Sequence, residues 1–199
     1  MTKKNFRALI KVGAGFNSSV LIFSVVILDQ CLKVFIKTSF ELGESYKITD
    51  WFILYFLENN GFAFGYEFFG SVGKLILTLF RLFASIFIFL WLRKLVIEYN
   101  KNGIGLGAVY GLSLVFAGAI GNIIDSVFYG LIFDYSSLFY GKVVDMFYFP
   151  LFSGFWPNWF PFFGGDYFVF FRPVFNIADA SITVGAVFLL FFQKQLSLK

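Results

Sequence analysis

The sequence has 199 residues, a length typical of a single domain. It is 59% hydrophobic and 24% aromatic but only 14% charged, whereas soluble domains carry about 25% charged residues. This composition excludes an ordinary water-soluble domain and indicates a membrane protein. The basic residues do not gather on polar faces, so nucleic acid is not an expected partner despite a formal net charge of +4.

The residue types that are missing narrow the chemistry. The sequence contains no histidine and one cysteine, Cys31. Ser–His–Asp and Cys–His catalysis, HExxH zinc sites and histidine-ligated haem are therefore excluded. One cysteine provides neither an internal disulfide nor the ligand spacing of a zinc or iron–sulfur site. We expect no metal and no cofactor, so hydrolytic chemistry would rest on carboxylates, lysine or hydroxyls.

Four apolar stretches approach the 20 or so residues that a membrane-spanning helix needs. In chain order they cover residues 16–36, 72–92, 104–129 and 174–192. The first is not expected to be a removable signal peptide, because its apolar run is too long and no small-residue cleavage site follows it. The sequence predicts an all-α membrane protein with a bundle of four transmembrane helices, formed by one domain over residues 1–199.

The distribution of basic residues predicts the orientation, because cytoplasmic segments are enriched in Lys and Arg. Nine basic residues and the single acid Glu98 lie in the two terminal segments and the connection between the second and third spans. The other two connections hold four basic and eight acidic residues. We therefore expect both termini to be cytoplasmic and both long connections to lie outside.

Both outer connections differ from ordinary loops. Residues 46–66 are rich in aromatic and β-branched residues, which favours short strands or a re-entrant cradle. Residues 133–171 include the run FWPNWFPFFGGDYFVFF, and its Trp156 and Trp159 suit the bilayer–water interface. We expect a small β-rich extracytoplasmic cradle and an aromatic interfacial segment, both lying on the membrane.

Charged and amide residues within the predicted spans gather toward the outer side. Such residues are costly in a membrane and usually functional. The set consists of Asp29 and Lys33 late in the first span, Asn122 and Asp125 late in the third, Asn176 and Asp179 early in the fourth, and Asp145 in the connection before it. Each has a simpler explanation, as a solvated helix cap, an i,i+4 ion pair or an amide that joins two helices. Because all lie at one depth, we favour a shared polar site.

Without histidine or metal, the chemistry that suits such a site is a pair of aspartates sharing one proton. The ionised partner takes a proton from water, and the protonated partner polarises a scissile carbonyl. Asp145 and Asp179 could approach each other. Residue types alone do not separate this pair from Asp29 and Asp125.

Five motifs in order carry a resemblance that covers nearly the whole chain. They are Asp29-Gln30-x-x-Lys33, Asn59-x-Gly61-x-Ala63-Phe64-Gly65, Gly118-x-x-Gly121-Asn122-x-x-Asp125, Val143-Val144-Asp145 and Phe175-Asn176-x-Ala178-Asp179. With them, the chain resembles lipoprotein signal peptidase, the bacterial type II signal peptidase. Each motif alone is weak, but five in order on a four-span frame are highly specific.

The resemblance implies an aspartyl endopeptidase of the bacterial cytoplasmic (inner) membrane with Asp145 and Asp179 as the catalytic pair. Its implied substrates are prolipoproteins whose cysteine bears diacylglycerol, cut just before that cysteine. The residues implied to shape the site or hold the substrate are Asp29, Lys33, Asn59, Gly61, Asn122, Asp125 and Asn176. Membrane lipids are the other expected partner, and we expect a monomer because one bundle can house the whole pair.

Two features depart from the family pattern. The family usually has arginine directly after the aspartate of the third-span motif, where this chain has Ser126, and Arg172 is a candidate replacement. The segment 146–173 is also longer than is usual in the family, which bears on the shape of the substrate entrance.

A different class of function is a small transporter or channel with proton-coupled aspartates. Transporter sites usually lie near the bilayer midplane between structural repeats, whereas these acids lie toward one face and the two halves of the chain do not correspond. A purely structural scaffold would leave Asp145 and Asp179 replaceable and would not explain the ordered motifs. We therefore favour the peptidase.

Overall fold

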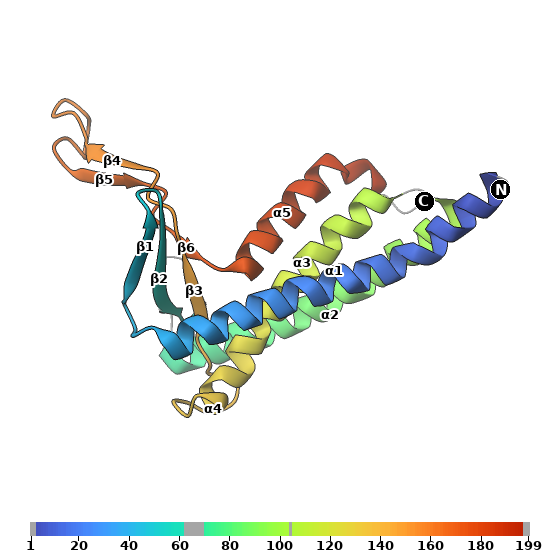
Figure 1. Ribbon diagram of the computed structural model, residues 1–199, viewed down its shortest axis with the longest axis horizontal. Coiled ribbons are helices and arrows are strands. Elements are labelled where there is room, and N and C mark those ends of the chain that lie inside the picture. The colour runs from blue at the N-terminus through green and yellow to red at the C-terminus, as the bar shows by residue number, and fades with distance from the viewer. Residues whose placement is uncertain (1–2, 62–69, 104, 197–199) are drawn as a thin grey trace.

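The structure, a computed structural model, describes residues 3–61, 70–103 and 105–196. Long helices run side by side, and a small sheet lies at one end of them (Figure 1). The start of the first helix and the end of the last lie at the opposite end (Figure 1). The described part of the chain therefore has a helical body and a β-rich head.

Within the described residues, five α-helices make up the body. They are α1 (Lys3–Ser39), α2 (Gly70–Asn102), α3 (Leu106–Ile124), α4 (Gly130–Ile132) and α5 (Ile177–Phe191). A π-helical turn, η2 (Asp125–Tyr129), joins α3 to α4 without a break, and a 3-10 turn, η3 (Gln193–Gln195), follows α5. The π-turn begins at an aspartate of the predicted site, and such turns are frequent at functional sites.

Across the three described ranges, three helical stretches are long and apolar enough to cross a membrane: Gly13–Ser39, Gly70–Asn102 and Leu106–Ile132. They confirm the first three predicted spans. The start of the predicted fourth span is wrong, because Val174–Phe175 forms a strand and α5 begins at Ile177. With 15 residues, α5 is about 22 Å long, which is shorter than the hydrocarbon core of about 30 Å. Four spans therefore remain a prediction.

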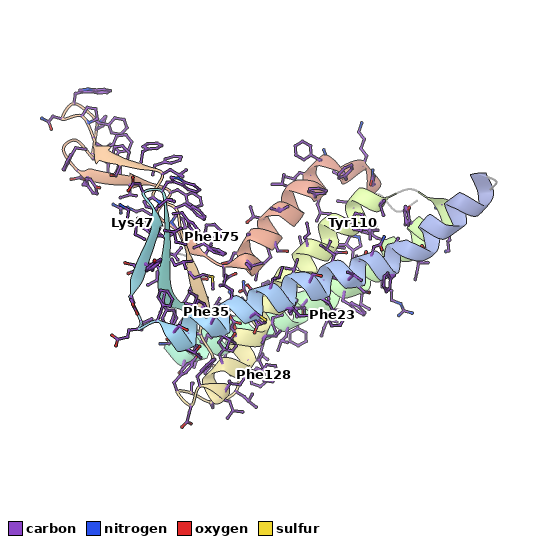
Figure 2. All side chains as sticks on the ribbon, in the orientation of Figure 1. Phe23, Phe35, Lys47, Tyr110, Phe128 and Phe175 are labelled. Carbon is purple, nitrogen blue, oxygen red and sulfur yellow. The ribbon has the colours of Figure 1, made fainter. Side chains whose placement is uncertain are left out.

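The central helix of the bundle is α3. In its most apolar stretch 56% of residues are buried, against 17% in α1 and 17% in α2. The outer helices instead present large apolar side chains to the surroundings, among them Phe23 and Phe35 of α1 (Figure 2). Soluble monomers rarely expose apolar surface of this extent, and such a surface suits contact with lipid.

Small residues bring α3 and α5 together. A Cβ on Gly185 would lie 2.6 Å from the carbonyl oxygen of Gly111, and one on Gly118 would collide with the carbonyl oxygen of Ala178. Close approach through glycine is a common way for membrane helices to pack. It holds the start of α5 beside the polar end of α3.

The main sheet of the described chain has four antiparallel strands, in the order β1-β2-β3-β6. They are β1 (Ser45–Thr49), β2 (Phe52–Asn59), β3 (Val143–Tyr148) and β6 (Val174–Phe175). The strands expected in 46–66 are confirmed as far as residue 59, and residues 62–66 lie outside the described part. The β2–β3 register sets Leu57 opposite Asp145, so the sheet carries one of the predicted catalytic residues.

The long aromatic segment folds into a separate hairpin of β4 (Phe152–Phe155) and β5 (Tyr167–Phe170). It projects beyond the main sheet, on the side away from α4 (Figure 1). Its rings stack on one another, as for Phe152 on Phe170 with centroids 4.5 Å apart. Even so, Phe162 is 98% exposed and Trp159 is 78% exposed. The hairpin therefore presents an apolar surface that no other described segment covers.

Candidate active site

The predicted polar residues meet where the helical body joins the sheet. They come from α1, the end of α3, the π-turn η2, strands β2 and β3, and the start of α5. At the centre, the Lys33 ammonium lies 2.8 Å from a carboxylate oxygen of Asp29 and 2.8 Å from one of Asp125, and all three side chains are at most 1% exposed. A buried charge is tolerated only with such partners. The triad therefore ties α1 to η2.

Gln30 closes the triad on its other side. Its amide nitrogen donates to Asp125 Oδ1 over 2.9 Å, and its amide oxygen accepts from the Tyr129 hydroxyl over 3.1 Å. The residue after Asp29 thus bonds to both ends of the π-turn, which fixes the turn against α1.

The remaining carboxylate oxygens of the triad hold two backbone segments. Asp29 Oδ1 accepts from the backbone N–H of Ala178 over 2.9 Å. Asp125 Oδ2 accepts from the backbone N–H of Val144 over 3.2 Å. Val144 and Ala178 directly precede Asp145 and Asp179 in the sequence. The triad thus fixes the backbone immediately before each aspartate of the predicted catalytic pair.

Two asparagines connect the triad to that pair. Asn122 Oδ1 accepts from Lys33 Nζ over 2.9 Å, so its amide nitrogen is turned to Asp179 Oδ1, to which it donates over 2.7 Å. Asn176 Nδ2 donates to Asp145 Oδ1 over 2.7 Å, while its Oδ1 accepts from the backbone N–H of Asp179 over 2.9 Å. One asparagine side chain therefore bonds to the carboxylate of Asp145 and to the backbone of Asp179.

The start of α5 is fixed by the same groups. Asn176 is the N-cap, and its backbone N–H donates to Asp179 Oδ2 over 3.4 Å, which completes a capping box. A capping box satisfies two backbone donors that a helix start leaves without partners. The motif that resembles the family's catalytic segment is thus also the local reason why a helix begins here.

Asp145 is 4% exposed, and its environment favours the protonated form. Burial raises the pKa of Asp145 to about 7, and the nearby Asp179 carboxylate adds to this rise. Hydrogen bonds from Asn59 and Asn176 and the charge of Lys33 oppose it. Since Asn59 Nδ2 lies 3.3 Å from Asp145 Oδ2, the end of β2 contributes directly to the site.

The turn after β2 requires glycine. Asn59 Oδ1 accepts from the backbone N–H of Gly61 over 2.7 Å, and Gly61 has a φ of +92°, a conformation that glycine adopts readily. A Cβ on Gly61 would also lie 2.7 Å from Arg81 Nη1. Gly61 therefore shapes the site because its lack of a side chain leaves room for the Arg81 guanidinium.

The sequence did not place Lys74 and Arg81, and both reach the site from α2. Arg81 Nη1 donates to Ser126 Oγ over 3.1 Å and Nη2 to the carbonyl oxygen of Gly61 over 3.0 Å. Lys74 Nζ donates to the carbonyl oxygen of Asn60 over 3.1 Å. The sequence feature that could have indicated their role is the pair of cations on one helix face within a span. Their partners are backbone oxygens and a hydroxyl, however, and such partners cannot be recognised from the sequence.

All nine predicted site residues lie in this cluster: Asp29, Lys33, Asn59, Gly61, Asn122, Asp125, Asp145, Asn176 and Asp179. Ala63, Phe64 and Gly65 of the second motif lie outside the described residues. Arg172 does not replace the missing arginine at position 126. Its side chain is exposed and donates to the Tyr167 carbonyl in the aromatic hairpin segment.

Apolar helices long enough to cross a membrane, with a buried cluster of carboxylates at the sheet end, define a membrane-embedded protein with an acidic site. The family model for signal peptidase (SPase) II matches residues 21–194. The lipoprotein signal peptidase of Porphyromonas gingivalis is 46% identical over 187 residues, covering 86% of this chain and 80% of that protein. The lipoprotein signal peptidase of Amoebophilus asiaticus is 37% identical over 183 residues, covering 87% and 75%.

Among solved structures, a bacterial membrane enzyme superposes with a TM-score of 0.59 at 28% sequence identity, covering 91% of this chain and 90% of that one. A second structure described in the same words gives a TM-score of 0.57 at 28% identity. The chain belongs to the signal peptidase II family, and it is a membrane peptidase.

Lys33→Met tests whether the triad supports the fold. The change leaves two buried carboxylates without their shared cation, and breaking a buried ion pair costs about 3–5 kcal/mol. We expect a much lower midpoint of thermal unfolding in detergent. Lys47→Met is the matched control, because Lys47 pairs with Asp50 where the side chains are 63% and 92% exposed, and it should leave the midpoint unchanged. Equal midpoints for the two variants would contradict a structural role of the triad.

Proposed function

We propose that this chain is an aspartyl endopeptidase that removes the signal peptide from prolipoproteins carrying a diacylglyceryl-cysteine, cutting just before that cysteine. The relatives named lipoprotein signal peptidase support the substrate class. The observation that carries the mechanism is that the Asn176 side chain donates to the Asp145 carboxylate and accepts from the backbone N–H of Asp179. This shared partner favours a pair of carboxyl groups acting together.

In the proposed mechanism, Asp145 holds the shared proton and Asp179 is the base. The pKa of Asp145, raised to about 7 chiefly by burial, supports this assignment. Asp179 accepts hydrogen bonds from the Asn122 amide and the Asn176 backbone. Those contacts hold its carboxylate in one orientation, as a general base requires.

The reaction follows from these roles. Asp179 takes a proton from a water molecule while the water oxygen attacks the scissile carbonyl carbon. At the same time Asp145 gives its proton to the carbonyl oxygen. The tetrahedral intermediate then collapses: Asp145 takes back the proton from the hydroxyl, and Asp179 gives its proton to the leaving nitrogen as the C–N bond breaks. The pair ends with one shared proton, as it began.

The location of the site suits this substrate. A cysteine linked to diacylglycerol holds the adjacent peptide bond near the membrane surface, and the site lies at the sheet end of the apolar helices. The end of α2, which carries Lys94 and Lys101, lies toward the other end (Figure 1), which supports cytoplasmic termini and an outward-facing sheet. We infer a chain in the bacterial inner membrane that works as a monomer, since it supplies the whole pair itself.

The aromatic hairpin β4–β5 extends this surface. Exposed Phe155, Trp159 and Phe162 suit the headgroup region, where amphipathic and aromatic rings collect. We infer that the hairpin lies on the outer leaflet beside the site, where it would flank a lipid-modified substrate.

Asp145→Asn and Asp179→Asn test the catalytic pair. Each change removes an ionisable group at nearly constant shape, so we expect loss of cleavage by at least about a thousandfold, on the scale of acid–base catalysis. The measurement is the gel shift of a diacylglyceryl-modified precursor with purified protein in detergent. Asp50→Asn, at a 92% exposed side chain, is the matched control and should cleave normally.

If either the Asp145→Asn or the Asp179→Asn variant folds and still cleaves at the wild-type rate, the pair is excluded and attention passes to Asp29 and Asp125. A wild-type protein that binds but never cleaves precursors would favour the transporter alternative.

The pH dependence of cleavage tests the shared proton. Since Asp145 with its pKa of about 7 is protonated below that value, the rate should fall as pH rises through about 7. Asn59→Ala removes a hydrogen bond that lowers this pKa. The alkaline limb should therefore move upward, on the order of one pH unit for a hydrogen bond to a charged group. An unchanged limb would exclude Asp145 as the proton carrier; Asp50→Asn should leave it in place.

The rings of the hairpin test its contact with lipid. In nanodiscs containing brominated lipids, the tryptophan fluorescence of the wild type should be quenched, and Trp159→Phe should lose part of the quenched signal because its ring is 78% exposed. Trp91→Phe is the control in the helical body. Trp159 emission that does not respond to brominated lipid would place the hairpin in water.

A further inference from the structure

Two cations at the site have no part in the mechanism so far. Lys74 and Arg81 lie two turns apart on α2, with Thr78 between them on the same face. Lys74 is 5% exposed. Among the described residues, no ion pair includes either side chain. Cations in a membrane helix are expensive, so their position near the carboxylates calls for a reason.

Arg81 is fixed between two elements of the site. Its guanidinium donates to the hydroxyl of Ser126, which directly follows Asp125, and to the carbonyl of Gly61, two residues after Asn59. From there its charge acts on the carboxylates of Asp179, Asp125 and Asp145. A planar guanidinium held by two acceptors keeps its charge at one place.

The charges that face the site nearly cancel. Four carboxyl groups come from α1, η2, β3 and α5, and three cations come from α1 and α2. They are Asp29, Asp125, Asp145 and Asp179, with Lys33, Lys74 and Arg81. Tyr129 also faces the triad through Gln30. A second cluster, Glu58 with Lys37 and Lys142, is ion-paired within itself.

A poorly solvated site favours the protonation state that leaves it without net charge. Three cations balance three of the four carboxylates, so neutrality needs one proton. Asp29 and Asp125 each lie 2.8 Å from the Lys33 ammonium, whereas among the described residues no ion pair includes Asp145 or Asp179. The single proton therefore belongs to Asp145 and Asp179.

We propose that Arg81 is a positioning residue that keeps this aspartate pair singly protonated, with its guanidinium fixed on the hydroxyl of Ser126, the residue at which the family pattern leads us to expect arginine. The inference rests on the proposed function. Without the guanidinium charge, neutrality would require a second proton, and the pair would be doubly protonated up to a higher pH. A doubly protonated pair has no base to activate water.

The sign of the effect is definite. An opposite charge near a carboxyl group favours its ionised form and so lowers its pKa. Removing the charge in Arg81→Gln should therefore move both limbs of the pH profile of cleavage upward by about 1–2 units. Arg81→Lys, which keeps the charge, should leave both limbs near their wild-type positions. Arg172→Gln, the same change at an exposed arginine of the hairpin segment, is the control and should shift neither limb.

A charge relocation sharpens the test. In the double variant Arg81→Gln with Ser126→Arg, the guanidinium moves from α2 to the residue after Asp125. We expect the limbs to return toward the wild-type pH. Unshifted limbs in Arg81→Gln, or equal shifts in Arg81→Gln and Arg81→Lys, would overturn the proposal. If Arg81→Gln fails to fold, the double variant decides: restored folding with wild-type limbs supports the proposal, and a second failure to fold overturns it.

Infrared titration separates this inference from the proposed function. The carboxylic acid C=O stretch that disappears in Asp145→Asn reports the proton on the pair without any turnover. In Arg81→Gln this band should persist to a pH about 1–2 units higher than in the wild type. A shifted band in a protein that cleaves no precursor would retain the charge role and reject the peptidase mechanism. Normal cleavage with an unshifted band would do the reverse.

Discussion

The contact on which the rest of the site depends is the buried Lys33 ammonium between Asp29 and Asp125. Two carboxylates at most 1% exposed would repel each other without it. With it, each carboxylate keeps a second oxygen for the backbone before a predicted catalytic residue, at Val144 and Ala178. One cation thus fixes a strand and a helix start from different parts of the chain relative to each other.

Amide side chains connect the triad to the aspartate pair by hydrogen bonds. An asparagine has a donor end and an acceptor end, so a cation at the oxygen of Asn122 turns its nitrogen toward Asp179. Asn176 uses both its ends, donating to Asp145 and accepting from the start of α5. In a chain without histidine, amides do the orienting that imidazole partners do elsewhere. The described hydrogen bonds to these two carboxyl groups thus come from amide groups, which do not titrate.

The sequence predicted the features that depend on local patterns. Three spans followed from apolar length and the first strands from residue type, and the polar residues that we expected at one depth do meet in one cluster. The failures have non-local causes. Val174 and Phe175 are apolar and continue the hydrophobic pattern of the predicted span, but they pair with Tyr148 and Phe147 of β3. The helix begins only after them, because Asn176 forms its N-terminal capping box. Lys74 and Arg81 could not be placed because their partners are backbone oxygens and the Ser126 hydroxyl.

The same limit applies to comparing the chain with its family position by position. At position 126 the family pattern leads us to expect arginine, and the chain has serine. The energy of a charge near a carboxylate depends on their distance and on the solvent between them, not on which segment carries the charge. Arg81 reaches the Ser126 hydroxyl from α2, and its charge acts on Asp179, Asp125 and Asp145. Under the proposed role of Arg81, the neighbouring helix α2 supplies a cation that the segment around Ser126 does not carry.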